Sequence, residues 1–479
     1  MDDTDSIPAD DELCDLTAVE LRRMLGERVV SAREVLAAHL ARVERIDPAV
    51  NAIVTRTFDA AEDAARAADE LAASGADLPT LHGLPTAHKD LLDTAGVRTT
   101  SGSTIFADHV PDADDPLVGR LREAGAISIG KTNTPEFGAG SHTFNEVFGL
   151  TRNPWDTARS AGGSSGGAAV AVACGMVPIA DGSDVGGSLR NPPSFNGVVG
   201  LRPSHGVVPF TGALASRRRS ATNGPIARTV ADAGLFLSAM AGPYENTPWA
   251  PPVDAADYAR TDVDRGRPRR VVISEDLGGL PVDPEVRGVM RAVAEACRTL
   301  GWEVVEDDPP LDGADESFEV LRAWEYWAHL DPLLGDRVAE AKGTIRQEVA
   351  RGSELSGREI AGAIAAETRI LRRMAVWFAD VDVLLTPTSQ VAAFPADQEW
   401  VTEIDGVRFE TYTAWMRSCS RITVTGHPAL SLPGGMTADG RPVGVQLVGG
   451  PRGDLALLRT AAALEAVLDV SRRPPILDP

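Results

Sequence analysis

The amino-acid sequence predicts an α/β protein with a large central mixed, mostly parallel sheet that helices flank. Short apolar runs of strand length alternate with helical patterns along the chain, and turns rich in Gly and Pro separate them. The chain has 479 residues, 43% of them hydrophobic, which is enough for a substantial core. We expect residues 1–479 to form a single domain.

The N-terminal part, residues 15–75, is predicted to be helical. The stretches TAVE (17–20) and SARE (31–34) are capping boxes, in which a Ser or Thr and a Glu three residues later satisfy the first free amides of a helix. An alanine-rich helix follows over about 58–73.

Strands and helices alternate after this helical part. Strands are predicted over 85–88, 126–129, 177–180, 271–274, 303–305, 383–386, 429–432 and 444–448. Helices are predicted over 116–124, 168–174, 230–241, 284–300 and 455–467.

Two later segments differ from this pattern. Residues 243–270 contain five prolines and indicate a surface connection. Residues 311–380 have a helical pattern throughout and concentrate aromatic side chains, which are more often core but can also wall an apolar pocket. Those side chains are Phe318, Trp324, Tyr326, Trp327, Trp377 and Phe378.

Charge and hydropathy exclude several classes of protein. The formal net charge of −23 repels nucleic acid, so we expect no DNA or RNA partner. No run of about 18 apolar residues is present, and therefore no membrane partner is expected. The N-terminus, MDDTDSIPADDELCD, is acidic and lacks the pattern of a signal peptide, which predicts a cytoplasmic protein.

The cysteines favour neither a metal nor a disulfide framework. Cys14, Cys174, Cys297 and Cys419 are too far apart for a zinc site or a compact set of disulfides. We predict small core residues in a reducing compartment, and neither a metal nor a cofactor.

Lysine is rare in this chain. Of 46 basic residues only Lys89, Lys131 and Lys342 are lysine, and lysine, unlike arginine, can give up its proton inside a protein. Lys89 lies in the run GLPTAHKD (83–90), at the end of a predicted strand. Burial there would lower its pKa and let it act as a general base. A salt bridge from Lys89 to Asp90 or another acid explains the pattern equally well.

Two Gly-Gly-Ser turns lie 24 residues apart, in GGSSGG (162–167) and DVGGS (184–188). The first matches G-x-S-x-G, but a nucleophile elbow needs a preceding strand, and residues 153–160 are polar and broken by proline. The second follows a predicted strand, and its glycines let backbone amides converge on an oxyanion. The nearest histidines in sequence, His142 and His205, lack a strand-end context.

Taken together, these motifs resemble those of the amidase signature family. Within this family they are most similar to the motifs of soluble bacterial amidases. Lys89, residues 162–167 and residues 184–190 carry the resemblance. Further stretches agree with it: 130–138, 196–203, 426–431 and 442–449. The resemblance covers roughly residues 15–468, and it implies the amidase signature fold with residues 80–240 as the catalytic core.

The resemblance implies a role for each motif residue. Ser188 would be the nucleophile, Ser164 a second serine that follows a cis peptide bond, and Lys89 the base. Lys131 falls in a further motif, and we interpret it as structural. The oxyanion hole would consist of the amides of Val185, Gly186, Gly187 and Ser188. Asp184 and Arg190 would support this loop from behind.

The implied activity is that of a serine-type hydrolase that cleaves the C–N bond of a small-molecule carboxylic amide through an acyl-enzyme on Ser188. We expect apolar or aryl amides, and also carbamates (urethanes), to be substrates, as for an aryl acylamidase or a urethanase. Alternatives are a glutamine-hydrolysing amidotransferase subunit that needs partner chains, a general esterase, and a binding protein without activity. The substrate pocket is expected between 318–327, Trp377 and the loops 141–148 and 210–220. A homodimer is the ordinary expectation for a soluble enzyme.

Overall fold

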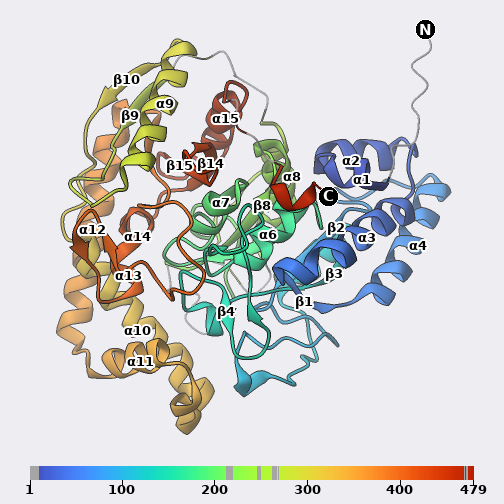
Figure 1. Ribbon diagram of the computed structural model, residues 1–479, viewed down its shortest axis with the longest axis horizontal. Helices are drawn as coiled ribbons and strands as arrows, with labels where there is room; N and C mark the ends of the chain where they lie inside the picture. The colour runs from blue at the N-terminus through green and yellow to red at the C-terminus, as the bar shows by residue number, and fades with distance from the viewer. Residues whose placement is uncertain are drawn as a thin grey trace.

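An eleven-stranded mixed sheet runs through the part of the chain that the structure describes, and helices flank it (Figure 1). The structure is a computed structural model, and it describes residues 10–211, 220–244, 247, 250–261, 267, 269–468, 470 and 473–478. In sheet order the strands are β1 (Ile53–Arg56), β3 (Ile127–Thr132), β2 (Pro85–Lys89), β6 (Ile179–Asp184), β8 (Thr222–Ala227), β7 (Val199–Arg202), β14 (Ala429–Met436), β15 (Pro442–Gly449), β11 (Val383–Pro387), β9 (Arg270–Ile273) and β10 (Glu303–Glu306). Two short hairpins lie outside this sheet: β4 (Phe144–Asn145) with β5 (Gly149–Leu150), and β12 (Glu403–Ile404) with β13 (Val407–Arg408).

The α-helices of the described residues are α1 (Asp10–Asp15), α2 (Ala18–Gly26), α3 (Ala32–Val50), α4 (Phe58–Ser74), α5 (Pro116–Glu123), α6 (Gly166–Ala173), α7 (Asn191–Asn196), α8 (Val230–Met240), α9 (Pro284–Thr299), α10 (Ala314–Leu334), α11 (Gly343–Glu354), α12 (Gly357–Trp377), α13 (Tyr412–Trp415), α14 (Arg417–Val424) and α15 (Asp454–Glu465). Figure 1 shows α1–α4 gathered at the β1–β3 side of the molecule and α10–α12 at the opposite side.

Both predicted capping boxes are confirmed. Thr17 caps α2 and Ser31 caps α3: each hydroxyl accepts from the amide three residues later, and the Glu at that position accepts in return. The alanine-rich helix is α4. Each of the eight predicted strands overlaps an observed strand, and each of the five helices predicted after residue 75 overlaps an observed helix.

The mixed α/β sheet is confirmed, but the expectation that it is mostly parallel is wrong. Six of the ten pairings between neighbouring strands of the described sheet are antiparallel. The parallel ones are β2 with β3 and β6, and β9 with β10 and β11. Parallel neighbours need long crossover connections, whereas a short turn joins β14 to β15 and makes them antiparallel. The strands β7 and β8, which were not predicted, also pair antiparallel at the centre of the sheet.

The two segments singled out in the sequence have different outcomes. Residues 311–380 are helical, as predicted, in α10, α11 and α12. Of the predicted connection over 243–270, residues 245–246, 248–249, 262–266 and 268 lie outside the described residues. Tyr258, in the described part, is buried beside Gly234 of α8. The division of the chain into domains stays a prediction.

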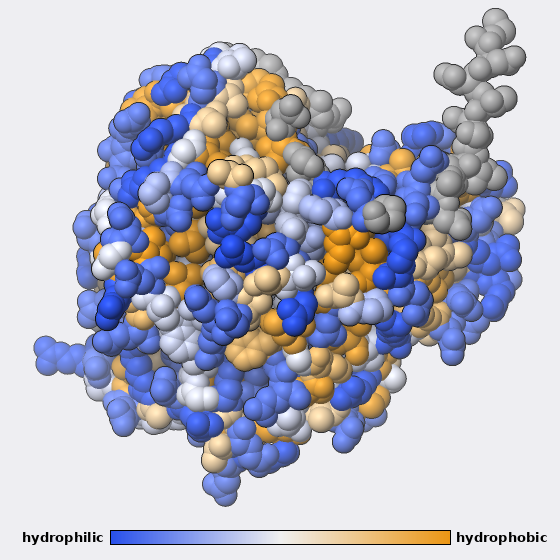
Figure 2. Space-filling model, viewed as in Figure 1, coloured by the Kyte–Doolittle hydropathy of each residue, from blue (hydrophilic) through white to orange (hydrophobic). Residues whose placement is uncertain are grey.

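The surface is mainly polar on the face shown in Figure 2, with hydrophilic residues over most of it and smaller hydrophobic areas between them. Within the described residues, no helix is both long and apolar enough to cross a membrane. All four cysteines are buried and unpaired. The expected cytoplasmic location, homodimer and lack of a nucleic-acid partner stay predictions.

Candidate active site

Lys89 and the two serine turns meet at the carboxyl ends of two neighbouring parallel strands. Lys89 is the last residue of β2, and β6 beside it ends at Asp184, four residues before Ser188. Parallel strands end at the same edge of a sheet, which is where α/β proteins usually form their sites. The first turn lies directly before α6, so that Ser164 faces this edge as well.

Lys89 is buried, at 1% exposure, and its Nζ contacts three hydroxyl groups. The distance from Nζ to Oγ is 2.7 Å for Ser164, 2.9 Å for Ser165 and 3.0 Å for Ser183. Ser165 and Ser183 were not predicted from the sequence, although each is the neighbour of a residue that was.

The hydrogen bonds of Ser165 indicate how a neutral Lys89 would be arranged. The Ser165 hydroxyl donates to the carbonyl of Ser183, 3.3 Å away, and therefore accepts from Lys89. A neutral amine has two N–H groups and one lone pair. With the two N–H groups directed to Ser165 and Ser183, the lone pair remains for the proton of Ser164.

Burial favours this neutral form. Desolvation lowers the pKa of Lys89 to about 7, while the negative charges of Asp184 and Asp181 act in the opposite direction. Lys89 therefore titrates close to neutral pH, the range in which a general base works best.

The competing interpretations of these motifs find no support in the described residues. Lys89 has no carboxylate within salt-bridge distance there, and Asp90 accepts instead from Thr100 at 2.6 Å. His142 contacts the hydroxyl of Ser160 rather than a turn serine. Ser165 is fully buried and follows no regular strand, so it does not form a nucleophile elbow.

The first turn has little room for side chains. The peptide bond between Gly163 and Ser164 is cis, as the resemblance implies. A Cβ on Gly163 would lie 2.7 Å from both the carbonyl oxygen of Gly140 and the amide nitrogen of His142. Glycine is therefore required where this turn passes the neighbouring backbone.

The second turn is held from behind by Asp184. One carboxylate oxygen of Asp184 accepts from the amide of Gly187 at 2.9 Å, and the other accepts from the amide of Leu189 at 3.0 Å. The Gly187 amide is thus already engaged and is not free for an oxyanion. No acceptor among the described residues engages the amides of the other three predicted donors, Val185, Gly186 and Ser188.

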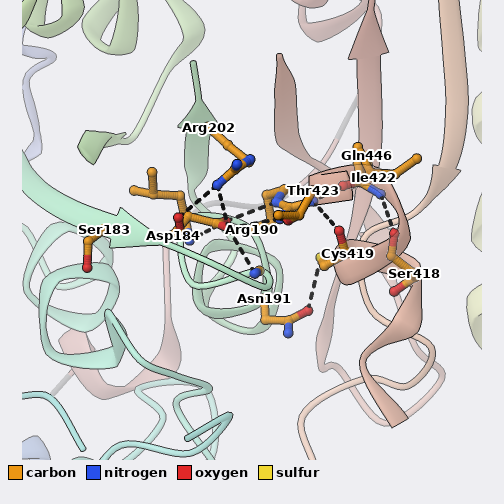
Figure 3. A network of polar contacts seen from close by, with 12 residues as sticks. Ser183, Asp184, Arg190, Asn191, Arg202, Ser418, Cys419, Ile422, Thr423 and Gln446 are labelled. Carbon is orange, nitrogen blue, oxygen red and sulfur yellow. Dashed lines mark hydrogen bonds and ion pairs between the residues drawn. The ribbon is translucent and has the colours of Figure 1, made fainter. Parts of the chain in front are cut away.

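Asp184 in turn belongs to a buried ionic network (Figure 3). Arg190 binds both of its oxygens, at 2.9 and 3.0 Å, and Arg202 binds it at 3.2 Å. Burial alone would raise the pKa of Asp184, but the two arginines hold it well below its usual range, so the carboxylate stays charged.

The same network reaches the C-terminal part of the chain. Arg190 donates to the Gln446 side chain of β15 at 2.7 Å, to Thr423 of α14 at 2.8 Å and to the Cys419 carbonyl at 2.9 Å. Sequence reasoning predicted Asp184 and Arg190 but missed Arg202 and Gln446. Both lie in stretches that agree with the family resemblance, 196–203 and 442–449, so these motifs could have identified them.

A cavity of about 520 Å³ opens beside these groups, and Lys89, Ser164 and Ser188 all line it. Ser188 is 9% exposed and lies at the cavity surface. The structure thus brings the three predicted residues together in one cavity. Within the described residues, no group of His, Cys, Asp or Glu side chains is placed to hold a metal ion.

Residues 34–458 match the sequence model of a protein family described as Amidase, which is most of the chain. The chain belongs to the amidase signature family. It is 36% identical to an acylamidase of Rhodococcus erythropolis over 469 residues, which cover 96% of this chain and 97% of that protein. It is 37% identical to a glutamyl-tRNA(Gln) amidotransferase subunit of Acidothermus cellulolyticus, over 94% of each chain. A solved bacterial aryl acylamidase of the amidase signature family has the same fold, with a TM-score of 0.90 at 26% identity over 96% of this chain and 98% of that chain.

The cavity wall of this amidase family member differs in part from the expected one. Phe210 and Tyr326 line it as predicted, but Trp377 and the loop 141–148 do not. Residues of the loops that follow β2 and β3 form that part of the wall instead. Phe318 lines a separate cavity of about 260 Å³. Residues 212–219 of the predicted loop 210–220 lie outside the described residues. The apolar residues that do line the cavity beside Ser188 are Leu91, Leu92, Phe106, Phe137, Val185, Phe210, Ala221, Tyr326, Leu330 and Leu333.

Proposed function

We propose that this amidase signature hydrolase cleaves a carboxylic amide through an acyl-enzyme on Ser188. The observation that carries the proposal is the 2.7 Å contact between Lys89 Nζ and Ser164 Oγ, in a cavity that Ser188 also lines. A serine nucleophile needs a base and a path for its proton. Lys89, which is buried and titrates near neutral pH, supplies the base, and the Ser164 hydroxyl supplies the path.

Proton transfer starts the reaction. Neutral Lys89 accepts the proton of Ser164 while Ser164 takes the proton of Ser188, and the Ser188 oxygen attacks the amide carbonyl carbon. The hydrogen bonds from Lys89 to Ser165 and Ser183 keep the lone pair directed at Ser164.

The negative charge then develops on the former carbonyl oxygen. We assign its stabilisation to the amides of Val185, Gly186 and Ser188, and we assign the Gly187 amide to holding the loop on Asp184. Asp184 and Arg190 fix the loop before substrate arrives, so that little reorganisation is needed during the reaction.

Breakdown of the intermediate returns the proton. Protonated Lys89 gives its proton through Ser164 to the leaving nitrogen, the C–N bond breaks, and the acyl group stays on Ser188. Water, activated by the same pair, hydrolyses the acyl-enzyme to the carboxylic acid.

The cavity supports an apolar or aryl substrate, either an amide or a carbamate. Phe106, Phe137, Phe210 and Tyr326 supply aromatic surface around the serine, and Leu91, Leu92, Leu330 and Leu333 add aliphatic surface. The similarity to an acylamidase and to an aryl acylamidase points in the same direction.

The second candidate is a glutamine-hydrolysing amidotransferase subunit, which the 37% identity to such a protein favours. Asp93, Asp115 and Glu325 line the cavity, and their carboxyl groups would repel the α-carboxylate of glutamine when charged. We therefore rank this function below hydrolysis of an apolar amide.

The test is release of amine or ammonia from an aryl anilide, an alkyl amide, an aryl carbamate and glutamine, together with release of the alcohol from an aryl ester. We expect turnover of the anilide or the carbamate, and a loss of at least about a thousandfold in kcat/KM for Ser188→Ala and Lys89→Ala, because such groups act as a unit. Ser353→Ala, an exposed serine on α11, is the matched control and should leave the rate unchanged.

Each outcome separates the candidates. Turnover of glutamine alone would support the amidotransferase function, which would then require a search for partner chains. Cleavage of the ester alone would indicate an esterase. Full activity of Ser188→Ala would refute the nucleophile, and failure of the wild type to react with a fluorophosphonate would favour a binding protein.

A further inference from the structure

A buried histidine–carboxylate pair lies directly behind the proposed base, and the mechanism above does not use it. His88, on β2, is the neighbour of Lys89, and Asp181 lies on β6 next to it. Nδ1 of His88 is 2.5 Å from Oδ2 of Asp181, and both side chains are almost completely buried. Neither residue lines the catalytic cavity.

Asp181 also holds the backbone of the base. Its second oxygen, Oδ1, accepts from the amide of Lys89 at 2.8 Å. Both carboxylate oxygens are therefore engaged by consecutive residues, one by the His88 ring and one by the Lys89 main chain. Because the carboxylate cannot rotate without breaking one of these bonds, it fixes the end of β2 relative to β6.

We propose that the His88–Asp181 pair is a positioning element for Lys89, in which Nδ1 of His88 donates to Asp181 and the carboxylate supplies a fixed negative charge next to the base. This proposal deepens the proposed function and rests on it, since it concerns the same base. It assigns a task to two residues that touch neither the substrate nor the reacting atoms.

The charge has a definite effect on the base. Burial lowers the pKa of Lys89, and Asp184 and Asp181 are the charges that oppose this. A lysine whose pKa fell far below neutral would be a poor proton acceptor, so the carboxylate keeps it basic enough for the reaction.

Other ionisable groups surround the pair. Lys131 on β3 is the neighbour of His88 in the sheet register and interacts with Asp90, Asp181 and Asp93. Asp115, at the start of α5, faces Asp181 as well. These groups are unchanged in the wild type, in Asp181→Asn and in His88→Asn, so a comparison of these three proteins isolates the charge of Asp181.

The experiment uses the scarcity of lysine in this chain. Protein labelled with ¹³C at the ε-carbon of lysine has three lysine signals, from Lys89, Lys131 and Lys342, and Lys131→Arg and Lys342→Arg variants identify the other two. The Lys89 signal is followed against pH in the full-length wild type, in Asp181→Asn and in His88→Asn.

We expect a wild-type midpoint near pH 7 and a midpoint lower by about half a unit or more in Asp181→Asn, which keeps an acceptor for the Lys89 amide but loses the charge. His88→Asn keeps a neutral donor near Nδ1 and should leave the midpoint unchanged. The base works when neutral, so activity is lost as pH falls through this midpoint. The acid limb of fluorophosphonate labelling at Ser188 should therefore move to lower pH in Asp181→Asn only.

The proposal is overturned if the Lys89 midpoint of Asp181→Asn equals that of the wild type, or if His88→Asn shifts it as far as Asp181→Asn does. If Asp181→Asn fails to fold, ¹⁵N-histidine spectra of the wild type replace the lysine titration. The His88→Asn variant identifies the signal of His88 in these spectra. A neutral Nδ1–H tautomer at neutral pH supports the pair as described, and an imidazolium overturns it. The lysine titration needs no substrate, so an absence of amide turnover would overturn the proposed function alone.

Discussion

At the scale of single residues, two adjacent glycines of the second turn carry different constraints. A Cβ on Gly187 would lie 2.8 Å from Cβ of Cys419 and 3.0 Å from the side-chain nitrogen of Asn191, and the residue has a φ of +138°. The nearest atoms to a Cβ on Gly186 would be the end of the Phe318 ring, at 2.9 Å, and the end of the Met416 side chain, at 3.5 Å. The Phe318 ring borders the cavity of about 260 Å³, which gives it room to shift. The Cβ of Cys419 and the backbone of Gly187 cannot adjust without moving the turn.

Gly187→Ala is therefore expected to be much more harmful than Gly186→Ala. We expect it to lower the free energy of unfolding by about 1–3 kcal/mol, because a strained backbone and a clash coincide. It should also lower kcat by at least about a hundredfold, because the amides that we assign to the oxyanion hole would shift with the turn. Thermal melting and anilide hydrolysis measure the two effects.

Gly186→Ala is the matched control for this prediction. It places the same methyl group one residue earlier on the same loop, and we expect kcat to stay within about tenfold of the wild type. Equal losses in both variants would contradict the different roles assigned to the two amides.

At the scale of single elements, α10 forms one wall of the catalytic cavity. Its lining residues follow the period of a helix, so that one face of α10 points toward the site. These residues are Glu325, Tyr326, His329, Leu330 and Leu333. Leu330 is buried, whereas Leu333, one turn later, is 51% exposed and lies toward the solvent end of this wall.

Leu333→Trp should therefore alter substrate choice without disturbing the core. The larger ring narrows the cavity, and we expect KM for a bulky aryl amide to rise about tenfold while KM for a small alkyl amide stays unchanged. Val376→Trp, at a 77% exposed position on α12 that does not line the cavity, is the control. Equal effects of Leu333→Trp on both substrates would place this residue outside the substrate path.

The elements also show how far the sequence could predict the fold. Helices with capping boxes and strands with apolar runs were predicted because their signals are local, as in α3 and β2. The strand β8 reads TNGPIA, with a Gly and a Pro in its middle, and it is extended only because β6 and β7 pair with it on both sides. Pairing across the sheet is a tertiary effect, so the antiparallel centre could not be predicted locally.

The candidate site shows the same limit. Motifs identified Lys89, Ser164 and Ser188, which lie within a hundred residues and end up in one cavity. The pairing of His88 with Asp181, and the contact of Arg190 with Gln446, join residues 93 and 256 positions apart. No local pattern marks such partners, because each depends on which strands become neighbours.

At the scale of the whole molecule, the ionic network around Asp184 joins strands from the N-terminal and the C-terminal parts of the chain. Asp184 ends β6 and Arg202 ends β7, whereas Gln446 belongs to β15, on the other side of β14. Arg190 contacts both groups and is fully buried. The loop that carries Ser188 is therefore held by N-terminal and C-terminal elements at once, and we expect these two parts of the chain to unfold together.

Arg190→Met tests this expectation. It leaves the buried charge of Asp184 with Arg202 as its only ionic partner, and breaking a buried pair in this way costs about 3–5 kcal/mol. Hydrogen exchange should then show earlier loss of protection in β2, β6, β11 and β15 together, with one shared melting temperature. Arg291→Met, which removes a surface arginine paired with Glu275, is the control and should leave that temperature unchanged. Separate transitions for β2 with β6 and for β11 with β15 would show instead that the chain unfolds in two parts, and that the network serves the catalytic loop alone.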